Sequence, residues 1–143
     1  MGVFMNLDEM TKSEVLEYVN NTNTGFIKYN NIKLIDYDKE SATMEVNITE
    51  NSLNPYGIVH GGLIFTLADT SMGVITRATG KIAVTLNSQI NYLLPAKGPK
   101  LISKAKAIKI GRTTALLTTE IFDDQNNLIA SSNATYYFLN EKK

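Results

Sequence analysis

Residues 54–62 combine side-chain types and a spacing that could support catalysis. They read Asn-Pro-Tyr-Gly-Ile-Val-His-Gly-Gly, include the only histidine of the chain, and lead directly into a helical pattern. From Gly61 to Thr76 the only ionisable residue is Asp69. A helix this apolar is normally buried, and a buried carboxylate is destabilising by several kcal/mol unless it is paired or hydrogen-bonded. The sequence therefore indicates a functional use of Asp69 and of the glycine pair before it.

Two catalytic groups are compatible with this helix. Its first residues, Gly61 and Gly62, lie where a helix presents unpaired N–H groups and the positive end of its dipole. A donor of this kind can stabilise a developing oxyanion by about 3–4 kcal/mol in a water-excluded site. Asp69, shielded from bulk solvent, could act as a general base toward water. In the structural alternative, the glycines allow close helix–sheet packing, and Asp69 pairs with a threonine or with Arg77.

The spacing of these two groups predicts an oligomer. Asp69 lies eight residues after Gly61, which is about 12 Å along a helix axis at 1.5 Å per residue. Two groups that act on one carbonyl must both lie within about 3 Å of the reacting atoms. If both are catalytic, each site takes its glycine from one chain and its aspartate from another.

The composition excludes several other classes of function. The 14 basic and 14 acidic residues cancel, so the chain has no electrostatic footprint for nucleic acid or an anionic membrane. The absence of cysteine excludes disulfides and thiolate catalysis, and a single histidine argues against a protein zinc site. No apolar run approaches the length of about 18 residues that a membrane span requires. We therefore expect no metal. We also expect a cytoplasmic protein, because the N-terminal residues carry no signal-peptide pattern.

Hydrophobic periodicity predicts an α+β domain built around the apolar helix. An amphipathic helix is expected at about residues 8–20, and a strand hairpin at residues 32–37 and 42–48, before the helix at 61–79. Further strands are expected at residues 82–92, 101–110, 113–122 and 128–139, the last three as an antiparallel meander. A single helix that is apolar on nearly all sides favours a curved antiparallel sheet of five to six strands wrapped around it. We expect one domain over residues 1–143, with its core at about 30–140.

The pattern Asn-x-x-Gly-x-x-His-Gly-Gly at residues 54–62, with Asp69 nine residues after the histidine, resembles the hotdog-fold acyl-CoA thioesterases. The similarity is greatest to the phenylacetyl-CoA, or PaaI-like, branch and extends over about residues 32–139. It includes Asn-Tyr-Leu-Leu-Pro-Ala at residues 91–96 and Gly-Arg-Thr at 111–113. Hydratases of the same fold are less similar, because they pair a catalytic histidine with an acid at a different spacing.

The resemblance implies an assembly and a set of roles. Two subunits would join their sheets edge to edge, as a homodimer or a dimer of dimers, with the thioester at the interface. Gly61 would donate its N–H to the oxyanion, and Asp69 would be the base or nucleophile. Asn54 and His60 would orient the thioester or water, and Thr85 would hydrogen-bond the lytic water.

Four further residues are candidates for substrate binding. Gly62 lies beside the oxyanion site, Tyr56 and Met72 could line an acyl pocket, and Arg112 could reach a CoA phosphate. Their structural alternatives are turn formation, core packing and a solvated charge at a hairpin tip.

The predicted function is hydrolysis of an acyl-CoA to a free acid and CoA. CoA would enter as part of the substrate, and no other cofactor would be needed. The alternatives are a non-catalytic module that binds or senses acyl-CoA, a hydrolase of acyl-carrier-protein thioesters, and a hydratase. The sequence leaves the acyl group open.

Overall fold

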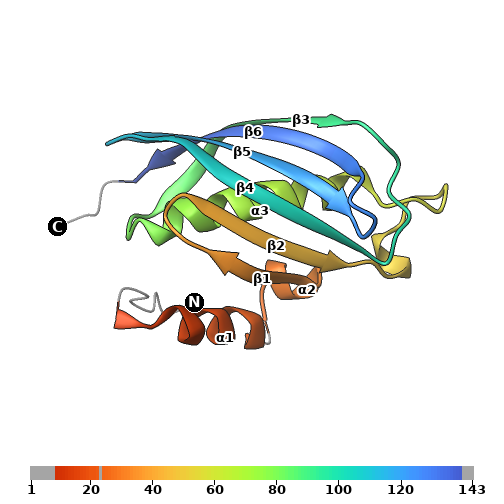
Figure 1. Ribbon diagram of the computed structural model, residues 1–143, viewed down its shortest axis with the longest axis horizontal. Coiled ribbons are helices and arrows are strands. Elements are labelled where there is room, and N and C mark those ends of the chain that lie inside the picture. The colour runs from red at the N-terminus through yellow and green to blue at the C-terminus, as the bar shows by residue number, and fades with distance from the viewer. Residues whose placement is uncertain (1–8, 23, 140–143) are drawn as a thin grey trace.

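The computed structural model describes residues 9–22 and 24–139, in which one long helix lies inside a curved antiparallel sheet (Figure 1). The elements are α1 (Lys12–Asn21), α2 (Phe26–Tyr29), β1 (Ile32–Tyr37), β2 (Ser41–Asn47), a 3₁₀ turn (Glu50–Ser52), α3 (Gly61–Ala78), β3 (Ala83–Tyr92), β4 (Lys100–Ile110), β5 (Thr114–Asp123) and β6 (Leu128–Phe138). This is the α+β hotdog arrangement that the sequence predicts. The prediction of a single domain over residues 1–143 stays a prediction.

The sheet has six strands in the order β1-β2-β4-β5-β6-β3. The β1–β2 hairpin and the β4–β5–β6 meander are confirmed. β3 pairs with β6 rather than with the next strand in sequence, β4. The segment after β3 carries the chain across one end of the sheet: the Leu93 N–H donates to the Ile129 carbonyl, and the Val59 N–H donates to Ala96. β3 is therefore an edge strand.

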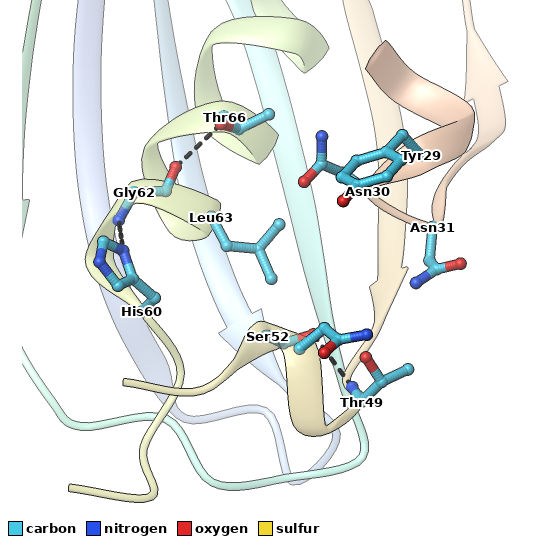
Figure 2. Close-up of a pocket in the computed structure, with 10 residues that line it drawn as sticks. Tyr29, Asn30, Asn31, Thr49, Ser52, His60, Gly62, Leu63 and Thr66 are labelled. Atoms are coloured by element: carbon cyan, nitrogen blue, oxygen red, sulfur yellow. Dashed lines mark hydrogen bonds between the residues drawn. The ribbon is translucent and has the colours of Figure 1, made fainter. Parts of the chain in front are cut away.

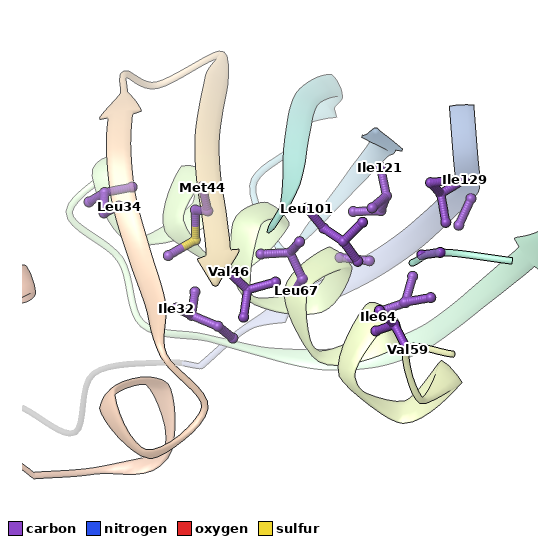
Figure 3. Packing of buried hydrophobic residues seen from close by; sticks show 13 residues of the cluster. Ile32, Leu34, Met44, Val46, Val59, Ile64, Leu67, Leu101, Ile121 and Ile129 are labelled. Atoms are coloured by element: carbon purple, nitrogen blue, oxygen red, sulfur yellow. The ribbon is translucent and has the colours of Figure 1, made fainter. Parts of the chain in front are cut away.

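The core lies between α3 and the concave face of the sheet. Leu67, Met72 and Ile75 of α3 are completely buried. One end of the core joins α3 to β1, β2, β4, β5 and β6, with Leu67 among Ile32, Val46 and neighbouring side chains (Figure 3). Each such buried aliphatic side chain contributes about 1.5–3 kcal/mol of transfer free energy. Packing on several sides of α3 explains why its sequence is apolar nearly all round.

The first helix begins later than predicted. Thr11 is its N-cap: the Thr11 hydroxyl accepts the Glu14 N–H, and the Glu14 carboxylate accepts the Thr11 N–H. This reciprocal capping box satisfies two backbone donors, so α1 starts at Lys12 rather than near residue 8. Asp8 lies outside the described residues. α2, a single helical turn, was not predicted.

β3 is more exposed than its alternating pattern suggests. A bulge between Thr85 and Asn87 shifts the register, and Val84 and Leu86 are 45% and 64% exposed. Exposed apolar groups on a ten-residue edge strand are unusual for a monomer, because such an edge invites pairing with another chain. None of the described helices is long and apolar enough to cross a membrane.

Candidate active site

The N-terminus of α3 presents one free backbone donor. His60 is the N-cap, and its Nδ1 accepts the Gly62 N–H at 2.8 Å. Its carbonyl accepts the Leu63 N–H at 3.0 Å. Within residues 9–22 and 24–139, the Gly61 N–H has no hydrogen-bond acceptor. The fold therefore leaves the Gly61 donor unpaired among these residues, whereas the Gly62 N–H is bound to the cap. The oxyanion role of Gly61 stays a prediction.

Asn54 shapes the loop that leads into the helix. Its Oδ1 accepts the N–H groups of Tyr56 at 2.9 Å and Ile58 at 3.3 Å. Gly57 completes the turn at φ 75°, a conformation in which glycine is unstrained. Asn54 and Gly61 border one cavity of about 310 Å³. Because Oδ1 is engaged in the loop, the amide N–H groups of Asn54 are the part available to a ligand.

Tyr92, at the end of β3, fixes the first residue of α3. Its hydroxyl donates to the Gly61 carbonyl at 2.8 Å, and partial burial raises the pKa of Tyr92. A methyl group on Gly61 would lie 3.3 Å from the Tyr92 ring, so a side chain there would press on the tyrosine. The role of Tyr92 was missed, although it lies in the 91–96 motif that carries part of the family resemblance.

Asp69 is hydrogen-bonded to two strands. The Thr85 hydroxyl of β3 donates to Asp69 Oδ1 at 2.8 Å. The Tyr136 hydroxyl of β6 lies 2.8 Å from the same Oδ1 and 2.6 Å from the Asp69 carbonyl oxygen. No hydrogen bond within the described part of the chain reaches Oδ2. Asp69 is only partly buried, although its apolar helix predicted a buried carboxylate. Two hydroxyl groups compensate the water that it loses, and Oδ2 is left without a partner among the described residues.

Tyr136 is the second residue that sequence reasoning missed. It lies in the strand pattern Thr-Tyr-Tyr-Phe, where nothing distinguishes a core tyrosine from one that binds a carboxylate. Burial, and then the nearby Asp69 carboxylate, raise the pKa of Tyr136 far above its ordinary value. The hydroxyl therefore stays protonated and acts as a donor.

The structure does not bring all the substrate-binding candidates together. Met72 is completely buried in the core, as in the packing alternative. Tyr56 is 87% exposed on the loop before α3. Arg112 lies in the turn between β4 and β5, at the opposite end of β4 from the Pro95–Pro99 segment that packs near His60. Their roles in substrate binding stay predictions.

A second cavity of about 400 Å³ lies beside the start of α3 (Figure 2). Gly62, Leu63 and Thr66 border it from the helix, and Tyr29–Asn31 face them from the end of α2. Its lining is mostly amide and hydroxyl groups. Among the described residues, no three histidine, cysteine or acidic side chains cluster as a metal site.

Comparisons with known proteins identify the family of this chain. A family model described as the Thioesterase superfamily matches residues 56–130. A curated relative from Archaeoglobus fulgidus is 30% identical over 134 residues, which cover 91% of this chain and 87% of the relative. The acyl-coenzyme A thioesterase PaaI of Escherichia coli is 30% identical over 100 residues, covering 69% of this chain and 71% of PaaI. The chain belongs to the thioesterase superfamily.

Solved structures extend the similarity to nearly the whole fold. The E. coli PaaI protein from the phenylacetic acid degradation operon has a TM-score of 0.82 at 25% identity, covering 90% of this chain and 94% of that one. A Streptococcus mutans protein bound to acetyl-CoA has a TM-score of 0.77 at 30% identity, covering 87% of this chain and 100% of that one. The predicted PaaI-like hotdog thioesterase, a thioester hydrolase, is confirmed as the class of this protein.

The oxyanion role of Gly61 can be tested with two substitutions that differ by one donor. Gly61→Ala and Gly61→Pro place the same Cβ against Tyr92, but only proline removes the N–H. Proline is tolerated at the first helical position, and the extended backbone of His60 suits a following proline. We expect the proline variant to turn over about 10²–10³-fold more slowly than the alanine variant, the usual effect of one lost oxyanion donor. Equal turnover in the two folded variants would contradict the role.

The contribution of His60 can be separated into capping and contact with substrate. His60→Ala removes the acceptor of the Gly62 N–H and should lower the free energy of unfolding by about 1 kcal/mol, whereas His60→Asn supplies a new cap acceptor. We expect the asparagine variant to recover both the melting temperature and most of the thiol-release rate. Recovery of the melting temperature without recovery of the thiol-release rate would instead indicate that the His60 imidazole contacts the substrate.

Proposed function

We propose that this protein hydrolyses acyl-CoA thioesters to free carboxylic acids and CoA. The observation that carries the proposal is the pair of groups on α3. Among the described residues, the Gly61 N–H has no acceptor and the Asp69 carboxylate is held through Oδ1 alone. The first can stabilise an oxyanion and the second can activate water. Two relatives fit this chemistry, since one is named as an acyl-coenzyme A thioesterase and another binds acetyl-CoA.

The reaction follows from these two groups. The thioester carbonyl oxygen accepts the Gly61 N–H, and Asp69 Oδ2 takes a proton from water as its oxygen adds to the carbonyl carbon. The tetrahedral intermediate then collapses, the carbon–sulfur bond breaks, and CoA leaves as the thiol with the proton returned through Asp69. Thr85, Asn54 and His60 position these parts. CoA enters as substrate, and the proposed reaction uses no further cofactor.

A complete site requires two chains. α3 is one unbroken helix from Gly61 to Ala78, so Gly61 and Asp69 of one chain lie about 12 Å apart along its axis. That distance exceeds the reach of two groups acting on one carbonyl. The aspartate of one chain must therefore work with Gly61 of the partner subunit.

β3 supplies a route to this pairing. Its Tyr92 contacts Gly61, and its Thr85 contacts Asp69. If β3 pairs antiparallel with β3 of a second copy, the Thr85 end of one strand lies beside the Tyr92 end of the other. Each aspartate is then carried toward the glycine of the partner subunit. The exposed Val84 and Leu86 on this edge support an interface there, and the homodimer is part of the proposal.

The substrate groups have two places to bind near this site. The cavity at Asn54 and Gly61 is bordered by Leu93, Leu94 and Pro95, which suit apolar atoms. The cavity at Gly62 is lined mostly by polar groups. The acyl specificity and the cytoplasmic location stay predictions, and a panel of acyl-CoA and acyl-carrier-protein thioesters assayed by thiol release separates the candidate substrates.

Asp69→Asn tests whether the carboxylate is the base. Asparagine can still accept hydrogen bonds from Thr85 and Tyr136 through its amide oxygen, so the fold should survive and the melting temperature should change little. Thiol release should fall by about 10²–10⁴-fold, the span typical of a lost general base. Wild-type turnover in the asparagine variant would exclude Asp69 as base and favour binding without catalysis.

Mixing two inactive variants tests the shared site. If Asp69→Asn and Gly61→Pro subunits exchange at random in a dimer, about half of the dimers are hybrids, and each hybrid has one intact and one doubly damaged site. We expect thiol release to recover to about a quarter of the wild-type rate per total site. Chemical cross-linking of each variant before mixing is the control and should prevent the recovery. Failure to recover, with exchange shown by mass spectrometry, would mean that each chain holds a complete site.

A further inference from the structure

One hydroxyl contacts Asp69 at two points. The Tyr136 hydroxyl lies 2.8 Å from the carboxylate Oδ1 and 2.6 Å from the Asp69 main-chain oxygen. Both of these atoms are acceptors, so the tyrosine is the donor and its single hydroxyl proton is shared between them. Tyr136 is only 3% exposed, and it reaches α3 from β6, the strand that lies next to the edge strand β3. The contact therefore joins the main chain and the side chain of Asp69 to one rigid strand.

We propose that Tyr136 is a positioning residue that, together with Thr85, holds Asp69 Oδ1 and leaves Oδ2 as the reactive oxygen. The proposal rests on the hydrolytic function proposed above. The terminal torsion of an aspartate is broad and nearly two-fold, so a free carboxylate presents either oxygen. The Thr85 proton, and the Tyr136 proton that is shared with the Asp69 carbonyl, both favour the orientation that keeps Oδ1 toward the strands.

The surroundings of Tyr136 are suited to this role. A methyl group on Gly73, one turn beyond Asp69, would lie 3.8 Å from both the ring and the hydroxyl of Tyr136, so the ring passes close to the helix backbone there. Burial raises the pKa of Tyr136, and the adjacent carboxylate raises it further, so the hydroxyl remains a donor over the pH range of catalysis.

Few other charges bear on Asp69. On α3 the only other charged residue is Arg77, two turns away, and β3 has no charged residue. In the described strands β1, β2, β4 and β5, none of the charged side chains occupies a buried position facing α3. From β6 the ionisable group that faces Asp69 is Tyr136 itself.

The test is Tyr136→Phe, with Tyr137→Phe as the matched control. Tyr137 is the next residue on β6, faces the other way and is half-exposed. A hydrogen bond donated to a carboxylate favours its charged form, so its loss raises the carboxyl pKa. We expect Tyr136→Phe to lower kcat by about 10- to 100-fold, as for a lost hydrogen bond to a charged group. The acidic limb of the kcat/KM profile should move to higher pH, and Tyr137→Phe should match the wild type.

A second measurement does not depend on turnover. Carbon-13 NMR of protein labelled at the aspartate carboxyls, with the Asp69 signal assigned by Asp69→Asn, should show a higher Asp69 pKa in Tyr136→Phe than in the wild type or Tyr137→Phe. A lower melting temperature with an unchanged kcat, acidic limb and carboxyl titration would overturn the proposal and leave Tyr136 a packing residue.

The experiments distinguish failure of the proposed hydrolytic function from failure of the proposed role of Tyr136. If the wild-type protein releases no thiol from any acyl-CoA, the proposed function is wrong, but the carboxyl titration still tests the contact. If Tyr136→Phe does not fold, proton NMR of the wild type decides. A slowly exchanging Tyr136 hydroxyl proton with a cross-peak to α3 supports the contact, and a hydroxyl proton in rapid exchange with water contradicts it.

Discussion

The proposed site depends on how one partly buried carboxylate is held on an otherwise apolar stretch of helix. α3 packs against strands of the concave face of the sheet, and its only ionisable residue before Arg77 is Asp69. Asp69 is only partly buried, but a carboxylate that loses part of its hydration at the edge of that helix–sheet layer still needs hydrogen-bond partners. Thr85 and Tyr136 come from the two neighbouring strands at one edge of the sheet, and together they satisfy one oxygen of Asp69. The same two contacts that replace the water lost by the Asp69 carboxylate therefore also orient the group proposed to do the chemistry.

The N-terminus of α3 has unpaired backbone groups of its own. The first backbone donors of any helix lack partners. Here His60 satisfies Gly62, Tyr92 holds the Gly61 carbonyl, and the Gly61 N–H is left unpaired among the described residues. A side chain at Gly61 would contact the ring that holds it, and a side chain at Gly62 would come within 2.9 Å of its own cap, His60 Nδ1. The glycine pair is thus explained by two close approaches, and both lie at the proposed oxyanion site.

Much of the fold could be predicted from the sequence, because its signals are local. Alternation in β2, the uncharged run of α3 and the turn residues between β4, β5 and β6 each reflect burial or backbone conformation within a few residues. The functional motif also lies mostly within one segment, so Asn54, His60, Gly61 and Asp69 were found together. The side-chain contacts that the sequence did not predict are non-local. Tyr92 and Tyr136 reach Gly61 and Asp69 across 31 and 67 residues of chain, and only strand pairing makes these contacts. The later start of α1 has a different cause: its cap joins Thr11 to Glu14 and is local, but hydrophobic periodicity does not report hydrogen bonds. The register shift in β3 depends on pairing with β6 and is non-local.

β3 is both an exposed edge of the sheet and the strand that contacts the two proposed catalytic residues. An exposed edge strand with apolar side chains is a liability for a lone chain, and proteins usually shorten, charge or cover such an edge. β3 is ten residues long, carries no charge, and holds the contacts to both Gly61 and Asp69. A bulge between Thr85 and Asn87 interrupts the regular ladder with β6, next to the residue whose hydroxyl donates to Asp69. Pairing with a second β3 would cover the exposed edge and, in the same step, bring the two unlike halves of the site together. In that arrangement each site is completed by two chains. Two proposed catalytic groups can therefore lie on one helix at a separation that no single thioester carbonyl could bridge.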